Sequence, residues 1–223
     1  MPYLIVHSMV YPIAKVVLPP IYNLWLRKVE GIENIPKDRP FIIASNHASY
    51  YDALLPAVTI APRINKKIHP LVNSYYWRPF ITRFFLNLWE AIPVYVAKEK
   101  NAKEKNRKAF EEALSCLKKE EMIMIFPEGA RSKDGKLKKA YTGVARLALK
   151  SKAPVLPVGI TDSYKVLPVG AAFPRFARCE VKIGKPISFE KYYNKKISNR
   201  LLEKITRSIM KQIAKLINQK YNY

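Results

Sequence analysis

Short apolar runs alternate with amphipathic segments from residue 39 onward, and this alternation is the strongest constraint on how the chain folds. The runs are continuously apolar, which is typical of strands covered on both faces of a sheet. They predict strands at 41–45, 68–72, 92–96, 122–126, 155–160 and 178–183. The intervening segments predict helices at 49–60, 75–89, 102–117 and 141–150. The sequence therefore predicts an α/β fold, with a mostly parallel or mixed sheet flanked by helices.

A further helix is predicted near the end of the chain, over residues 199–219. Its aliphatic stripe comprises Leu201, Ile205, Ile209, Ile213 and Ile217. Lysines and arginines fall largely on another face. Basic amphipathic helices of this kind bind membranes in some proteins, but more often they pack on a core and expose a charged face to water. We favour the packed helix.

The first thirty residues are largely apolar, but Lys15 and the Pro19-Pro20 pair divide them into pieces too short to span a bilayer. We expect two short helices that lie in one leaflet, with Trp25, Arg27 and Lys28 at the level of the lipid headgroups. Residues 1–30 would then form an interfacial anchor and residues 31–223 the main domain. The alternative is an N-terminal helix buried against that domain.

The charge balance indicates an anionic partner. Forty Lys and Arg residues against seventeen Asp and Glu give a formal net charge of +23, which suits nucleic acid, an acidic membrane surface or a phosphorylated substrate. A nucleic-acid-binding module is the first rival class, but the sequence contains no zinc-finger spacing and no RNA-binding motif. A phosphate-binding loop is excluded, because Gly129 and Gly135 are one residue too far apart and Leu137 follows Lys136.

The two cysteines, Cys116 and Cys179, are too few for a disulfide framework and show no metal-ligand spacing. Three histidines are also too few for a histidine-rich metal site. We therefore expect a reducing compartment and no metal in the functional site.

A polar motif, Asn46-His47-Ala48-Ser49-Tyr50-Tyr51-Asp52, follows the first predicted strand. This places His47 beyond the carboxyl end of a strand, where open α/β sheets carry their sites. Asp52 can fix one imidazole nitrogen as a donor and leave the other as a free base. Ser49 and Asp52 also have the spacing of a capping box, which makes Ser49 the predicted helix N-cap. In the alternative reading Asp52 only caps its helix and His47 is structural.

A second motif, Phe126-Pro127-Glu128-Gly129-Ala130-Arg131-Ser132, follows another predicted strand. Glycine permits close approach of the backbone, and the guanidinium of Arg131 matches phosphate oxygens. The lysines that follow, between residues 133 and 139, would raise the local potential for an anion. For these lysines we favour the alternative of an ordinary solvated surface turn.

With these two motifs, the chain resembles the glycerolipid acyltransferase family, whose best-known members are lysophosphatidate acyltransferases. The first motif matches the family block N-H-x-S-x-x-D, and the second matches F-P-E-G-T-R-S with Ala130 in place of threonine. A later V-x-P-x-x-I block is matched by Val155, Pro157 and Ile160. The order and spacing of the blocks agree from about residue 30 to about residue 185. The resemblance departs at Tyr95-Val96, where the family commonly has an acidic residue and an arginine; Lys98 is the nearest replacement for that charge.

The resemblance implies transfer of a fatty acyl group from a thioester of coenzyme A or acyl carrier protein to a lysophospholipid hydroxyl, with lysophosphatidate as the expected acceptor and phosphatidate as product. It implies His47 as general base and Asp52 as the group that orients it. The implied substrate-binding residues are Asn46, Lys98, Glu128, Gly129, Arg131 and Ser132. It implies no cofactor other than the acyl donor, and a membrane-associated protein at the cytoplasmic face of an anionic bilayer. The alternatives are another lipid acceptor and a non-catalytic membrane- or nucleic-acid-binding protein.

Overall fold

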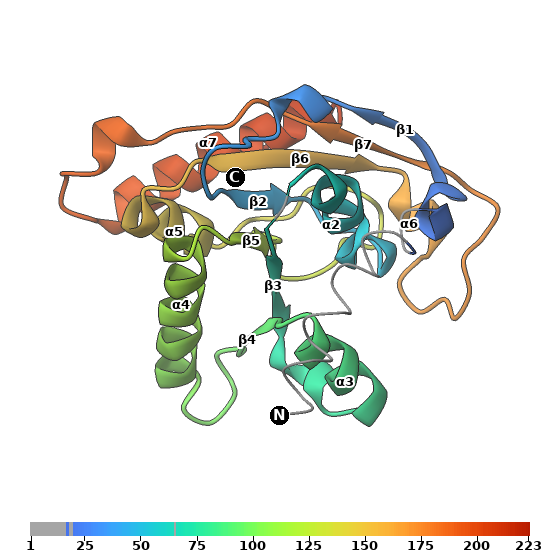
Figure 1. Ribbon diagram of the computed structural model, residues 1–223, viewed down its shortest axis with the longest axis horizontal. Coiled ribbons are helices and arrows are strands. Elements are labelled where there is room, and N and C mark those ends of the chain that lie inside the picture. Colours follow the sequence, from blue (N-terminus) through green and yellow to red (C-terminus); the bar gives the residue numbers. More distant parts are fainter. Residues whose placement is uncertain (1–16, 18–19, 65) are drawn as a thin grey trace.

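A seven-stranded sheet forms the centre of the computed structural model, which describes residues 17, 20–64 and 66–223 (Figure 1). The strand order is β1-β7-β6-β2-β5-β3-β4. All neighbours are parallel except β6 and β7, so the sheet is mixed but mostly parallel, as predicted. The strands are β1 (Leu26–Glu30), β2 (Ile42–Ser45), β3 (Ile68–Asn73), β4 (Ile92–Val94), β5 (Met122–Ile125), β6 (Val155–Thr161) and β7 (Cys179–Ile183).

Helices connect and cover these strands. They are α2 (Leu55–Ile60), α3 (Phe80–Leu88), α4 (Ala102–Lys118), α5 (Gly143–Ser151), α6 (Ser163–Val166) and α7 (Asn199–Leu216). Single turns of 3₁₀-helix occur at η1 (Ile32–Asn34), η2 (Tyr51–Ala53), η3 (Ala61–Arg63), η4 (Ser74–Trp77) and η5 (Glu190–Tyr192). Among the described residues, no helix is long and apolar enough to cross a bilayer.

The core has two halves, one on each face of the sheet. Ile42 and Ala44 pack into one cluster with residues of α4, α5 and α7, whereas Phe41 and Ile43 pack into the other, with residues of α2. Successive side chains of a strand point to opposite faces, so a strand that serves both halves is apolar at every position. This confirms the sheet covered on both faces that the continuous apolar runs predict.

The C-terminal helix is a packed helix, as favoured from the sequence. Ile205, Ile209 and Ile213 are buried in the same core half as α4 and α5. Its first turn is capped by Ser198, whose hydroxyl accepts a hydrogen bond from the backbone N–H of Leu201.

The first strand lies inside the segment that the sequence assigned to the N-terminal anchor. β1 pairs in parallel with β7, and the Arg27 guanidinium forms an ion pair with Glu180 of that strand. Trp25 donates from Nε1 to the backbone carbonyl of Arg175 at 3.1 Å. Residues 26–30 therefore belong to the main domain, and the predicted boundary at residue 30 is wrong. The anchor predicted for residues 1–16, 18 and 19 lies outside the described residues.

Two of the predicted helices are interrupted, and both interruptions involve proline. The segment predicted as one helix over 49–60 is the turn η2 followed by α2, which has Pro56 in its first turn. The segment 75–89 is η4 followed by α3, with Pro79 at the N-cap. Proline has no N–H to donate and its ring clashes with the preceding turn, so it fits the start of a helix and not its interior.

Candidate active site

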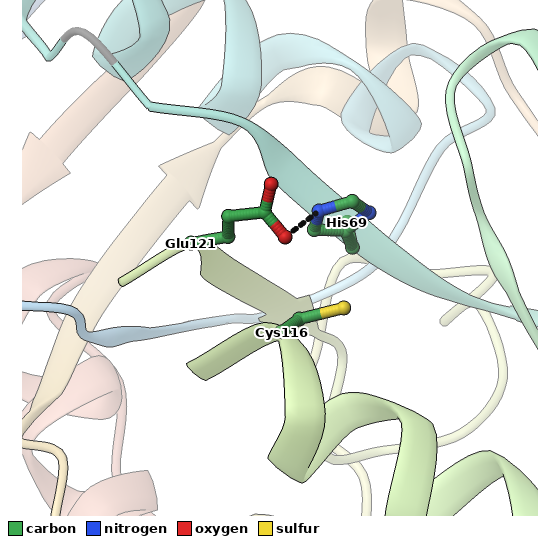
Figure 2. Close-up of side chains that lie close together, drawn as sticks. All are labelled: His69, Cys116 and Glu121. Atoms are coloured by element: carbon green, nitrogen blue, oxygen red, sulfur yellow. Dashed lines mark hydrogen bonds and ion pairs between the residues drawn. The ribbon is translucent and has the colours of Figure 1, made fainter. Parts of the chain in front are cut away.

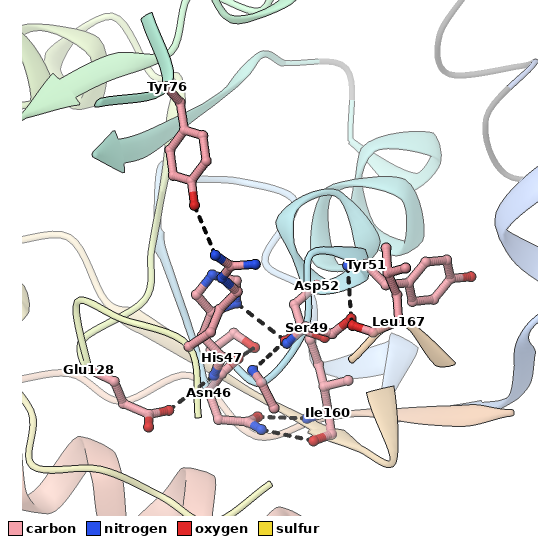
Figure 3. Close-up of polar contacts among 12 residues, drawn as sticks. Asn46, His47, Ser49, Tyr51, Asp52, Tyr76, Glu128, Ile160 and Leu167 are labelled. Carbon is pink, nitrogen blue, oxygen red and sulfur yellow. Dashed lines mark hydrogen bonds and ion pairs between the residues drawn. The ribbon is translucent and has the colours of Figure 1, made fainter. Parts of the chain in front are cut away.

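Asn46 directly follows β2 and joins it by hydrogen bonds to the neighbouring strand β6. Its amide nitrogen donates to the backbone carbonyl of Ile160 at 2.8 Å, and its amide oxygen accepts from the backbone N–H of Ile160 at 2.7 Å. The side chain is buried, and these two bonds take the place of ladder pairing between β2 and β6 (Figure 3). This geometry indicates that Asn46 positions the residue after it, whereas the sequence assigned it to substrate binding.

His47 is held by Asp52 and keeps one ring nitrogen free. Nδ1 of His47 lies 3.2 Å from Oδ2 of Asp52, whose side chain is fully buried (Figure 3). Within the described part of the chain, Nε2 has no hydrogen-bond partner, and 16% of the imidazole side chain is exposed. The ring stacks on Phe126, with centroids 4.1 Å apart. A carboxylate on Nδ1 holds the proton there and leaves the Nε2 lone pair available as a base.

Asp52 also organises the loop that carries His47. The same Oδ2 atom accepts from the backbone N–H groups of Ala48 at 2.6 Å and Ser49 at 2.7 Å. Ser49 is not the N-cap of a long helix as predicted: its hydroxyl accepts from the N–H of Tyr51 and donates to the carbonyl of Leu167. The short spacing between Ser49 and Asp52 thus belongs to a tight loop, in which the same carboxylate binds both the backbone N–H groups and the imidazole.

Glu128 joins the two motifs through the backbone. Its Oε1 accepts from the N–H of His47 at 3.0 Å, and its Oε2 accepts from the N–H of Lys138 at 2.7 Å. The side chain is almost fully buried, and burial raises its pKa to about 7, against the opposing effect of the two N–H donors. Glu128 was predicted to bind substrate. In the structure each of its two carboxylate oxygens accepts a backbone N–H from a different loop, so the side chain holds the two loops together.

Gly129 and Ser132 shape the turn between these loops. Gly129 has φ of +66°, and a Cβ there would lie 2.8 Å from the ring of Tyr141. Ser132 donates from its N–H to the carbonyl of His47 at 2.7 Å, and its hydroxyl donates to Asp134 at 2.8 Å. Both residues were predicted to bind substrate, but their contacts place them in support of His47 and of the loop that carries Arg131.

The guanidinium of Arg131 is fixed by two tyrosines and retains one donor without a partner among the described residues. Its Nη2 donates to the Tyr76 hydroxyl at 3.0 Å, and its guanidinium carbon lies 3.4 Å from the ring centroid of Tyr50. Nη1 is buried and has no partner among the described residues. Since the first motif contributes Tyr50 and the second contributes Arg131, this stack brings a fixed cation beside the His47 loop.

The two tyrosines were not predicted as site residues. Tyr76 lies in η4 after β3, and Tyr50 lies between Ser49 and Asp52. The signal available in the sequence was the density of aromatic residues at 75–77. The contacts of Tyr50 and Tyr76 with Arg131 show that these two rings orient the guanidinium.

The structure does not bring Lys98 into contact with this cluster. Lys98 is exposed and follows β4, the edge strand that lies beyond β5 and β3 from β2. Parallel pairing places the ends of β2, β5, β3 and β4 on one edge of the sheet, so Lys98 lies on the same edge as His47 but several strands away.

The cluster can therefore do two things chemically. It offers a base, Nε2 of His47, on a partly exposed ring that is backed by a buried carboxylate. It also offers a fixed guanidinium with a free N–H for an anionic group. A substrate that carries both a hydroxyl and a phosphate matches this pair.

Comparisons with known proteins agree with this geometry. A family model described as Acyltransferase matches residues 26–161. A chloroplastic 1-acyl-sn-glycerol-3-phosphate acyltransferase of Brassica napus is 27% identical over 68% of this chain and 42% of its own length. A 1-acyl-sn-glycerol-3-phosphate acyltransferase of Bacillus subtilis is 26% identical over 86% of this chain and 88% of its own length.

Among solved structures, the crystal structure of the 1-acyl-sn-glycerophosphate acyltransferase PlsC from Thermotoga maritima aligns with a TM-score of 0.68 and 25% identity. The alignment covers 94% of this chain and 81% of that one. The chain spans less than half the length of the Brassica relative and of a similar Arabidopsis thaliana protein.

Proposed function

The chain belongs to the acyltransferase family, and from that premise we propose that it transfers a fatty acyl group from an acyl thioester to the free hydroxyl of a lysophospholipid. The acceptor we propose is 1-acylglycerol-3-phosphate, which would give phosphatidate. The names of the Brassica and Bacillus relatives support this acceptor. The free Nε2 of His47, with Asp52 on Nδ1, is the observation that carries the proposal.

The proposed reaction needs one base. Nε2 of His47 takes the proton from the acceptor hydroxyl as its oxygen attacks the thioester carbonyl. The C–S bond then breaks, and the imidazolium returns the proton to the departing thiolate. Asp52 stabilises the imidazolium while it exists, because its charge lies against the ring. The thioester supplies the driving force, so we propose no cofactor beyond the acyl donor, coenzyme A or acyl carrier protein.

Arg131 is the proposed phosphate-binding group. Its stack on Tyr50 and its bond to Tyr76 fix the plane of the guanidinium, and Nη1 remains for a phosphate oxygen. Lys98 is proposed to add charge from the same edge of the sheet. Asn46, Glu128, Gly129 and Ser132 contribute by holding the loops in place.

We also propose that the protein works on the cytoplasmic face of an anionic membrane. The aromatic helix α3 exposes Phe80, Ile81, Phe84 and Phe85, each by half or more of its surface. The Arg83 guanidinium lies over Phe80, and Arg78 lies over Tyr75 just before the helix. Apolar rings rimmed by guanidinium groups suit the boundary between acyl chains and acidic headgroups.

The decisive experiment is acyl transfer by purified protein in anionic liposomes, with acyl-coenzyme A and acyl carrier protein donors offered separately. The acceptors are lysophospholipids with different headgroups, and mass spectrometry identifies the products. We expect phosphatidate from 1-acylglycerol-3-phosphate, and loss of at least 99% of turnover in His47→Ala, with unchanged thermal unfolding. Wild-type turnover in that variant would refute the role of His47; a different preferred acceptor would correct the substrate alone.

Membrane binding is tested by flotation with liposomes that contain anionic lipid. Exchange of Phe84 and Phe85 for serine should move the protein out of the floated fraction, because two exposed rings are lost from the proposed surface. Exchange of Phe173 and Phe176 for serine is the matched control, since both rings are exposed in the segment between α6 and β7. Equal loss of flotation in the control would contradict α3 as the docking helix.

A further inference from the structure

A second cluster of reactive side chains lies at the opposite edge of the sheet. His69 is near the start of β3, Glu121 immediately precedes β5, and Cys116 lies near the end of α4 (Figure 2). Because β2, β3 and β5 are parallel, the starts of β3 and β5 lie away from the edge where His47 follows β2. His69 and Cys116 are both buried. The mechanism uses none of these three residues.

The two ring nitrogens of His69 both face oxygen acceptors. Nδ1 lies 3.1 Å from the backbone carbonyl of Glu90, and Nε2 lies 3.1 Å from Oε2 of Glu121. A carbonyl accepts only, so Nδ1 carries a proton and Nε2 is directed at the carboxylate. A proton shared between Nε2 and Oε2 satisfies this contact, and so does a metal cation. Histidines that ligate metals through Nε2 commonly have Nδ1 bound to a carbonyl in this way.

Cys116 completes a set of three different ligand types. A ring nitrogen of His69, Sγ of Cys116 and a carboxylate oxygen of Glu121 all lie within 4.8 Å of one another. A tetrahedral zinc ion with bonds of about 2.0–2.3 Å holds its ligand atoms about 3.3–3.7 Å apart. The Nε2–Oε2 pair, at 3.1 Å, must open slightly, and a pair at the 4.8 Å limit must close by about 1.1–1.5 Å. The Glu121 side chain is 22% exposed, which gives it freedom to rotate and gives an ion a path from solvent.

We propose that His69, Cys116 and Glu121 bind a zinc ion, with water as the fourth ligand. The mixture of imidazole, thiolate and carboxylate favours zinc over magnesium or calcium, which prefer oxygen ligands alone. Cys116 binds as a thiolate, so its thiol proton leaves when the ion binds. Zinc then carries two anionic ligands, the thiolate and the carboxylate, and one neutral imidazole.

The bound ion would connect α4 to the starts of β3 and β5. Cys116 and Glu121 are close in sequence, at the end of α4 and just before β5, whereas His69 comes from β3, far earlier in the chain. No spacing rule in the sequence detects such a site, because residues 69, 116 and 121 meet only when the sheet has formed. The proposal does not depend on the acyltransferase activity.

The test is binding of Co²⁺ and Zn²⁺ to the full chain after treatment with a chelator. Co²⁺ bound to a thiolate gives a sulfur-to-metal charge-transfer absorption band, which Zn²⁺ abolishes by displacement. We expect the band in wild-type protein and in Cys179→Ser, the control for the other buried cysteine, and its absence in Cys116→Ser. A wild-type protein without the band, or a band that survives in Cys116→Ser, would overturn the proposal.

Glu121→Gln provides a variant that should fold, because Glu121 is partly exposed and a glutamine oxygen can still accept from His69. We expect its Zn²⁺ affinity to fall at least tenfold in isothermal titration, while its thermal unfolding without metal stays close to that of wild type. Titrations of the wild type in buffers of different ionisation enthalpy should show proton release on zinc binding, because the Cys116 thiol is deprotonated. Unchanged affinity in Glu121→Gln, or release of no protons, would exclude this set of ligands.

Discussion

Replacement of Asp52 by asparagine separates the charge of this residue from its hydrogen bonds. All three of its contacts use one oxygen, Oδ2, which accepts from Ala48, Ser49 and Nδ1 of His47. A carboxamide oxygen in that place can accept the same three bonds, so Asp52→Asn keeps the loop and the ring orientation but removes the negative charge. The new amide nitrogen takes the position of Oδ1, which is buried and has no partner among the described residues.

The distance between the charges sets the size of the effect. At 3.2 Å between Nδ1 and Oδ2, and at an effective dielectric constant of about 20, a full imidazolium charge interacts with the carboxylate by about 5 kcal/mol. If about half of that charge has formed in the transition state, the barrier rises by about 2.5 kcal/mol without the carboxylate, and by about 5 kcal/mol if the charge is complete. We therefore expect kcat to fall by about 10²–10⁴.

The assay is steady-state acyl transfer from an acyl-coenzyme A donor, with urea unfolding measured on the same preparations. The unpartnered amide should lower the free energy of unfolding by about 1–3 kcal/mol, so kinetics are recorded where the variant is folded. Asp38→Asn is the matched control at an exposed aspartate, and its kcat should not change. If folded Asp52→Asn kept kcat within threefold of wild type, the carboxylate would be structural and the imidazolium would form without its help.

Two further predictions concern the proposed anion-binding groups, and a third concerns the buried Glu128. In Arg131→Lys the charge remains but the planar fork is lost, so the KM for a phosphorylated acceptor should rise about tenfold or more with little change in kcat; an unchanged KM would locate the phosphate elsewhere. Lys98→Ala should raise the same KM by about threefold, whereas the neighbouring exposed Lys100→Ala should not; equal effects would indicate only a general loss of charge. Burial raises the pKa of Glu128 to about 7, so the folded state retains a proton that the unfolded chain releases above about pH 4.5, and stability should fall as the pH rises through 7. Urea unfolding at about pH 5 and about pH 8 should show this fall in wild type but not in Glu128→Gln.

Local patterns predicted the sheet and the centre of the site. β2, β5 and β6 were predictable because they are apolar along nearly their whole length, as burial on both faces requires. The contact between His47 and Asp52 was predictable because a histidine that follows a strand, with an aspartate five residues further on, has few ways to arrange itself. The edge strand β1 escaped prediction because Leu-Arg-Lys-Val-Glu is neither continuously apolar nor regularly alternating; its place depends on pairing with β7, which is remote in sequence.

The contacts of Arg131 could not be predicted, for the same physical reason. Tyr50 is near it only because β2 and β5 are neighbours, and Tyr76 only because β3 pairs with the other side of β5. The sequence shows that a guanidinium follows a strand; it does not show which rings surround it. Pairing of strands far apart in the chain supplies that information, and no local periodicity records it.

The same long-range pairing explains why the second motif contains so few groups that are free to touch a substrate. Both backbone polar groups of His47 bind that motif. Its N–H donates to Glu128, and its carbonyl accepts from Ser132. A base on an exposed loop would sample many orientations, and it would have to return to the productive one before each proton transfer. By fixing the backbone of His47 from one side while Asp52 fixes its ring from the other, the fold removes that freedom in advance. Glu128 and Ser132 therefore support the proposed reaction by positioning His47. Arg131 has an unpartnered N–H that can donate to a phosphate.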